Sequence, residues 1–244
     1  MLHPDTPIGT LAANDARAIS VFEHYGIDYC CGGHRRLGEV LHERGIPLEK
    51  LESELSSVMP STAENGSAGR DWNVASLTEL SDFITKKHHE FLRRELPFIE
   101  NLMAKVIEHH GARHASSLLP LRRVFRHFKQ ELEAHLRKEE SVLFPALRNL
   151  EEARGGENRA RPDFGKFSNP IRMMLLEHES AGWELEEMRQ LTTYYTPPAD
   201  ACESYRELYR RLRALETDMH MHMHLENNIL FPRTVKLEQE SGGG

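Results

Sequence analysis

The chain of 244 residues is predicted to be all-α, with a small N-terminal helical domain followed by an up-down four-helix bundle. Apolar residues recur at spacings of three and four through most of the chain, and alternating β-branched residues are scarce. A histidine and a glutamate four residues apart interrupt the apolar stripe of two different helices. The predicted domains are residues 1–58 and 76–240, joined by a flexible, breaker-rich linker over residues 59–75.

The composition excludes several classes of partner. The 38 acidic and 31 basic side chains give a formal charge of −7, which argues against nucleic-acid binding through a basic surface. No apolar run approaches the ~20 residues of a membrane span, and the first residues do not resemble a secretory signal. Three cysteines, two of them adjacent, cannot form a disulfide framework. We therefore expect a soluble cytoplasmic protein.

The N-terminal domain is predicted to contain three helices. The first runs from Ile8 to Tyr25 and is ended by Gly26, and two shorter ones lie near residues 37–41 and 48–55. This segment therefore has a small apolar pattern of its own.

A cysteine pair lies between the first two of these helices, in the sequence DYCCGGH of residues 28–34. Adjacent cysteines do not easily form a disulfide, and the two glycines allow a partner to approach the backbone closely. A helix beginning near Arg35 would lower the pKa of the thiols through its N-terminal dipole. Cys30 and Cys31 are either two small buried apolar residues or a thiol pair with a redox or metal-handling role.

The first bundle helix, predicted from about residue 76 to 108, contains the pair His88 and His89. His88 is in phase with Ile84 and Phe91, and His89 with a second apolar row. The pattern slightly favours His88 as the inward residue, although a kink at Pro97 would change the phase. Residues 108–114 are expected to form a loop whose histidines face water.

The second and fourth bundle helices carry the same inward pair, His135 with Glu139 and His222 with Glu226. A buried histidine and carboxylate need partners, which a metal ion or a core hydrogen bond could provide. One pair alone would favour the hydrogen bond, but the recurrence favours the metal. Both pairs continue as His-x3-Glu-x4-Phe-Pro, which indicates a pseudo-symmetric bundle.

The third bundle helix adds His178 in the middle of its apolar stripe, next to small residues that leave room beside it. Four imidazoles and two carboxylates in one core suit two metal ions bridged by the glutamates, and the ligand types admit iron, zinc or manganese. On the remaining helix faces His220, His224 and Glu140 are expected in solvent.

These motifs together resemble the bacterial repair-of-iron-centres family, and the bundle resembles a hemerythrin-like domain. The match extends from the cysteine motif to the final Leu-Phe-Pro-Arg of residues 230–233. The resemblance implies two non-haem iron ions per chain, bridged by Glu139, Glu226 and an oxo or hydroxo group. It implies His89, rather than His88, as the ligand from the first bundle helix, and it implies a homodimer.

The resemblance implies repair of iron-sulfur clusters damaged by nitrosative and oxidative stress, with damaged iron-sulfur proteins as partners. Oxygen-carrying hemerythrins use five histidines, whereas this inward set has four, so open positions should bind nitric oxide or oxygen species or release iron. Cys30 and Cys31 would then receive or deliver iron, sulfide or electrons. Alternatives are reduction of nitric oxide to nitrous oxide, which would make the protein an enzyme, and a non-catalytic oxygen or redox sensor. Glu131 and Glu177 are candidates for supporting the ligands, or ordinary surface carboxylates.

Overall fold

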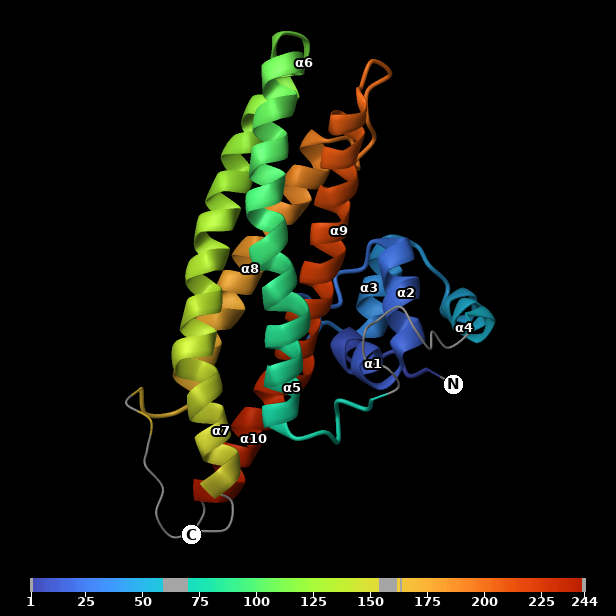
Figure 1. Cartoon of the computed structure of the whole chain (residues 1–244). Coiled ribbons are helices and arrows are strands. Elements are labelled where there is room, and N and C mark those ends of the chain that lie inside the picture. Colours follow the sequence, from blue (N-terminus) through green and yellow to red (C-terminus); the bar gives the residue numbers. More distant parts are fainter. Residues whose placement is uncertain (1, 59–69, 154–161, 163, 243–244) are drawn as a thin grey trace. The chain divides into compact units, whose positions relative to one another are not determined.

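The computed structural model describes residues 2–58, 70–153, 162 and 164–242. Within these ranges every regular element is a helix, and the single bridge between extended residues pairs Pro7 with Arg36. The predicted all-α class is therefore confirmed (Figure 1). No helix in the described part of the chain combines the length and the apolar character needed to cross a membrane.

The chain divides into two compact units, Met1–Ser81 with Met221–Gly244, and Asp82–His220. The division falls within one continuous helix, α9 (Glu203–Leu225), so the last segment of the chain belongs to the unit that contains the N-terminus. The domain boundaries expected from the sequence stay a prediction. Residues 59–69 of the expected linker lie outside the described residues.

The first unit begins with four short helices, α1 (Ile8–Asn14), α2 (Ala16–Tyr25), α3 (Leu37–Arg44) and α4 (Leu48–Ser57). The single helix expected over residues 8–25 is broken at Asp15. The backbone of Asp15 is extended, and its side chain accepts a hydrogen bond from the Arg17 amide at 3.0 Å, which caps α2. Gly26 ends α2 in the left-handed conformation that favours glycine, with φ of 61°.

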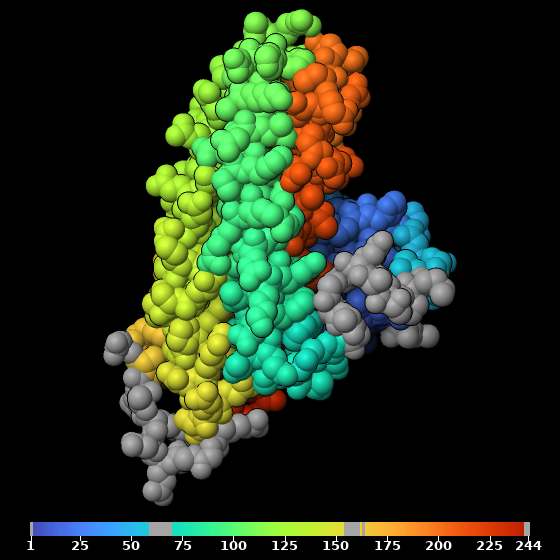
Figure 2. Space-filling view, viewed as in Figure 1, coloured from blue at the N-terminus to red at the C-terminus, as the bar shows by residue number. Residues whose placement is uncertain are grey.

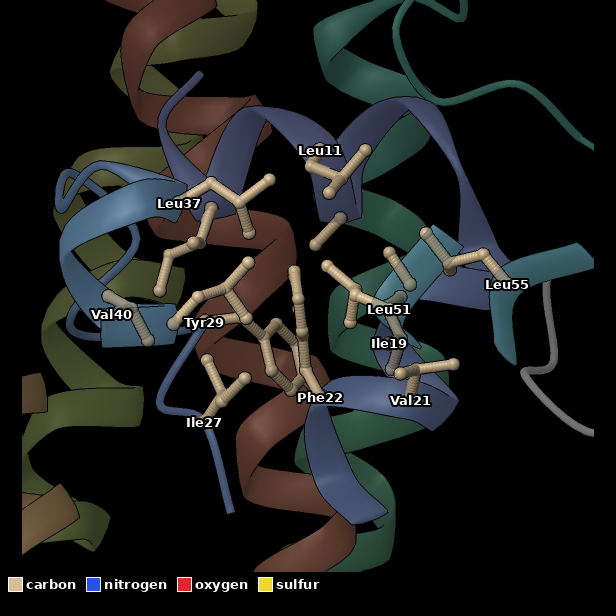
Figure 3. Close-up of a cluster of buried hydrophobic side chains, with 14 residues drawn as sticks. Leu11, Ile19, Val21, Phe22, Ile27, Tyr29, Leu37, Val40, Leu51 and Leu55 are labelled. Atoms are coloured by element: carbon tan, nitrogen blue, oxygen red, sulfur yellow. The ribbon is translucent and has the colours of Figure 1, made fainter. Parts of the chain in front are cut away.

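The core of the first unit gathers apolar side chains from all four helices and from the loop after α2. Figure 3 shows the rings of Phe22 and Tyr29 in the middle of this cluster, among Ile27, Leu37 and Leu51. The unit also contains the π-helical turn η4 (Glu226–Leu230), which α1 contacts, and helix α10 (Phe231–Gly242). The loop that carries the cysteines is therefore part of a packed unit with the C-terminal segment.

The second unit is built on long antiparallel helices. Helix α5 (Leu77–Ile84) begins in the first unit and ends in the second, where it leads into the π-helical turn η1 (Thr85–His89) and helix α6 (Glu90–Lys138). The backbone of His114 leaves the helical region, with φ −117° and ψ 25°, and there the chain reverses, so that α6 forms two arms (Figure 1). Figure 2 shows these arms packed along their length. The π-helical turn η2 (Glu139–Leu143), α7 (Phe144–Glu152) and α8 (Ser168–Leu191) follow.

The prediction of a loop over residues 108–114 is wrong, because these residues belong to α6 and only His114 leaves the helical conformation. His109 is exposed as expected, whereas His110 and His114 are half-buried. Nε2 of His114 donates to Oδ1 of Asp200 across 2.9 Å.

Candidate metal centre

Each π-helical turn of the described chain contains one predicted metal ligand. His89 ends η1, Glu139 begins η2 and Glu226 begins η4. A π-helical turn is rare and is found mostly at functional sites, because it rotates the side chains beyond it relative to an α-helix. The turn at Thr85–His89 accounts for the ambiguous phase of the first bundle helix, and both His88 and His89 are buried.

The two neighbouring histidines have different partners. Nδ1 of His88 lies 3.0 Å from Oδ1 of Asp218. Nδ1 of His89 lies 2.7 Å from Oε1 of Glu140, while its Nε2 lies 3.5 Å from Oε2 of Glu139. Because a carboxylate only accepts, Nδ1 of His89 donates, so the tautomer of a neutral ring has its lone pair on Nε2, on the side of Glu139.

His135 repeats this arrangement on the other side of Glu139. Its Nδ1 donates to Oε2 of Glu177 across 2.7 Å, and its Nε2 lies 3.4 Å from Oε1 of Glu139 and 3.0 Å from Nε2 of His178. Burial raises the pKa of Glu177, but hydrogen bonds from His135 and Lys138 outweigh it and lower the pKa to about 2. Glu177 is therefore an anion that keeps the proton of His135 on Nδ1.

Glu139 lies between these two imidazoles and is completely buried. Neither of its side-chain oxygens accepts a hydrogen bond from the described residues. A buried carboxylate that faces two imidazole lone pairs is strongly unfavourable unless cations lie between them. Distances of 3.4 and 3.5 Å between nitrogen and oxygen fit two ligands of one ion, each bonded at about 2.1 Å. The donor set thus fits a metal ion on each side of Glu139.

A second histidine and glutamate pair lies in the first unit. His222 and Glu226 are both completely buried, and Nε2 of His222 lies 3.0 Å from Oε1 of Glu226. The spacing and the burial match those of His135 and Glu139.

Glu140 lies behind His89, a position that the sequence pattern does not reveal. It was expected in solvent, and this expectation is wrong, because its carboxylate accepts from Nδ1 of His89 and, at 2.6 Å, from Arg93. Glu177, one of the two candidates for supporting the ligands, accepts the Nδ1 proton of His135. Glu131 is exposed, and its charge acts on His127 and Glu184, so nothing in its position supports a role at the metal.

The cysteine loop of the first unit is held by Asp28. The side chain of Asp28 accepts hydrogen bonds from the amides of Cys31, at 2.9 Å, and Gly32, at 3.0 Å. The two Sγ atoms lie 3.9 Å apart and are not joined in a disulfide. A hydrogen bond with Cys31 and burial raise the pKa of Cys30. The expected lowering by a helix N-terminus is wrong for Cys30, because α3 begins only at Leu37.

Two asparagines that follow Glu226 bind this loop. Asn227 donates to the Cys30 carbonyl at 3.1 Å, and Asn228 donates to the Tyr29 carbonyl at 3.0 Å. A Cβ atom at Gly33 would collide with the side chain of Asn228, so the glycine allows this close approach, as the sequence suggested.

His224 lies under the same loop and is only 2 % exposed, which contradicts its expected position in solvent. Its Nδ1 accepts from the Asn228 amide at 2.9 Å, and its ring meets that of Tyr29 edge to face at 5.4 Å. Burial lowers the pKa of His224 to about 4, so the ring is neutral. This face of α9 is therefore covered by Tyr29, from the loop after α2 in the same unit.

The fold and the buried donors define a helical bundle that binds cations through histidine and glutamate. Residues 82–234 match the family model of the hemerythrin HHE cation-binding domain, and residues 4–59 match the ScdA_N domain, a domain of unknown function.

Relatives extend over nearly the whole chain. A probable iron-sulfur cluster repair protein of Haemophilus influenzae is 35 % identical over 228 residues, which are 93 % of this chain and 96 % of that protein. The iron-sulfur cluster repair protein YtfE of Edwardsiella ictaluri is 36 % identical over 235 residues, 96 % of this chain and 99 % of the relative. YtfE of an Escherichia coli strain is 33 % identical over the same length. The chain belongs to this iron-sulfur cluster repair family.

Proposed function

We propose that the chain binds two non-haem iron ions and repairs iron-sulfur clusters damaged by nitrosative and oxidative stress. The observation that carries the proposal is Glu139, a buried carboxylate with an imidazole Nε2 atom opposite each oxygen. The cation-binding family domain spans residues 82–234 and so includes both histidine and glutamate pairs. The proposed ligands are four histidines and two bridging glutamates: His89, His135, His178, His222, Glu139 and Glu226.

The carboxylates behind the histidine ligands prepare these ligands to bind an ion, and the small number of histidines leaves positions from which the ion can be released. Glu140 and Glu177 fix the Nδ1 protons of His89 and His135, which keeps both Nε2 atoms ready to bind metal. Bound iron would supply a labile ion for an incomplete cluster and open positions for nitric oxide or oxygen species. Four histidines leave more open positions than five would. We therefore propose donation of iron to damaged iron-sulfur proteins.

We propose that Cys30 and Cys31 receive or deliver iron, sulfide or electrons during repair. Cys30 is buried and Cys31 half-buried, and Asn227 ties the Cys30 carbonyl to the residue after Glu226. Replacing both cysteines by serine should abolish restoration of a purified, damaged cluster protein, whereas replacing the exposed Cys202 should not. If the double variant restores the damaged cluster protein fully, the cysteines have no role in repair.

The proposed iron site is tested by metal content and Mössbauer spectra of anaerobically prepared protein. The wild type and the control His109→Ala, at an exposed histidine, should contain two coupled irons per chain. His222→Ala and Glu226→Ala should lose them while circular dichroism reports an unchanged helix content. Zinc in place of iron, or unchanged metal in both variants, would overturn the proposal.

Measuring whether nitric oxide is consumed repeatedly distinguishes an iron donor from a nitric oxide reductase. Addition of nitric oxide with an external electron donor should give one round of nitrosylation if the protein is an iron donor, and steady nitrous oxide if it is a reductase. We also propose a cytoplasmic homodimer, from the family resemblance, and sedimentation equilibrium at several concentrations tests the dimer.

A further inference from the structure

Three sulfur atoms from distant parts of the sequence gather in the first unit. Sγ of Cys31 lies 3.9 Å from Sγ of Cys30 and 3.8 Å from Sδ of Met223. Cys30 is 4 % exposed and Met223 is completely buried. The thioether belongs to α9, and the cysteine loop is held against the following turn by Asn227 and Asn228. This sulfur cluster is therefore built by the packing of two segments and is distinct from the histidine and glutamate donors.

The distances in the sulfur cluster fit a single ion. Three sulfur atoms in a plane around one ion, each bonded at about 2.3 Å, lie about 4.0 Å from one another. The two separations of 3.9 and 3.8 Å are close to this value. Sγ of Cys31 already lies at this distance from both partners, and an ion bound by all three sulfur atoms would place Sγ of Cys30 and Sδ of Met223 about 4.0 Å apart as well.

The ligand types select the ion. Two thiolates and a thioether are soft ligands, which favour Cu(I) over hard divalent cations. A structural zinc site needs four ligands. The remaining candidate is Asp28, whose two oxygens already accept the backbone amides of Cys31 and Gly32 that shape the loop. Three-coordinate Cu(I) needs no ligand beyond the three sulfur atoms.

We propose that Cys30, Cys31 and Met223 bind one Cu(I) ion. Two copper–thiolate bonds and one copper–thioether bond form, two S–H bonds break, and two protons pass to solvent, so copper and sulfur keep their oxidation states. One of these protons leaves the thiol of Cys30, which lies 3.2 Å from Oδ1 of Asp28. Bound copper would occupy the thiols assigned to repair and so inhibit that step. The site itself does not rest on iron donation.

The test titrates full-length, iron-loaded protein with Cu(I) held by the coloured chelator bicinchoninate, without oxygen. The wild type should take one Cu(I) per chain from the chelator. Cys31→Ser should lose this binding, and Met223→Leu, which keeps a similar volume, should weaken it by about tenfold or more. Cys202→Ser and Met173→Leu remove an exposed thiol and an exposed thioether, and both should bind as the wild type does.

X-ray absorption at the copper edge identifies the ligands. The wild type should give three sulfur neighbours at about 2.3 Å, and Met223→Leu should give two, with helix content checked by circular dichroism. An unchanged affinity in Met223→Leu, nitrogen neighbours with loss of iron, or displacement of copper by an equal concentration of Zn²⁺ would overturn the proposal. If the protein binds Cu(I) but cannot be loaded with iron, this inference stands and the proposed iron-dependent repair function is contradicted.

Discussion

Glu140 and Glu177 have equivalent positions on the two sides of Glu139. Each accepts the Nδ1 proton of one histidine, and each is also paired with a cation, Arg93 in one case and Lys138 in the other. A carboxylate that holds a ligating histidine fixes its tautomer and increases its basicity. His89 and His135 thus have the same kind of hydrogen-bond partner, a carboxylate that is itself paired with a cation.

Loss of Glu177 should weaken the metal site without removing a ligand. Glu177→Gln keeps the shape of the side chain but removes the charge that accepts from His135, and metal affinity should fall about 10- to 100-fold. Release of iron to a chelator measures the effect. Glu131→Gln, at the exposed candidate, is the matched control and should release iron at the wild-type rate. Equal rates for the two variants would contradict the role given to Glu177.

His224 should make the stability of the metal-free protein depend on pH. Its pKa is lowered from 6.5 to about 4 in the folded chain, so the unfolded chain binds the additional proton between these values. The free energy of unfolding should therefore fall as the pH drops from 6.5 to 4, by about 3 kcal/mol from this residue. Urea unfolding at several pH values compares the wild type with His224→Gln, which should lose this part of the slope. Parallel curves would refute the assignment.

At the residue scale, the sequence predicted the inward histidines and glutamates because their apolar neighbours repeat at helical spacing. It could not predict the burial of His224, which depends on contact with Tyr29 from a loop far earlier in the chain. It could not predict Glu140 either, since the only signal is its position next to Glu139. Choosing His89 over His88 needed the family resemblance rather than the pattern.

At the scale of elements, the helices were largely predictable and their interruptions only in part. A helix end at Gly26 and an interruption over residues 108–114 were expected from the sequence, whereas the break at Asp15 was not. No backbone change occurs at Pro97, where a kink was considered, because the change of phase lies earlier, in Thr85–His89. Patterns that assume a constant helical period cannot locate a π-helical turn, since it changes that period.

Contact between the cysteine loop and the last π-helical turn should depend on Gly33. Gly33→Ala would place a Cβ atom against Asn228 and the Tyr29 carbonyl, and the free energy of unfolding should fall by about 1–3 kcal/mol. Gly111→Ala is the control, because it lies within a helix and would meet only the side chain of Ile107, so it should be neutral or stabilising. Urea unfolding of both variants measures the difference, and equal stabilities would show that the glycine is not required.

At the scale of the molecule, the two ends of the chain form one unit. Deleting residues 2–58 would remove Tyr29 from the ring of His224 and uncover Met223. In the metal-free truncated chain, the pKa of His224 should return from about 4 towards 6.5, as followed by NMR of the imidazole protons. The exposed His109 provides the internal reference, with the same titration in both chains. A pKa that stays low after truncation would mean that the bundle alone buries this residue.

The joining of the chain ends also sets an order of events during protein synthesis. The cysteine loop is translated early, whereas its partners Met223, Asn227 and Asn228 follow after the whole of Asp82–His220. Cys31 and Met223 are separated by 192 residues, so at roughly 5–20 residues per second the interval lasts on the order of 10–40 s. During that time the nascent thiols lack the covering segment and are open to oxidants and metal ions, so the state of Cys30 and Cys31 can be decided before the chain leaves the ribosome.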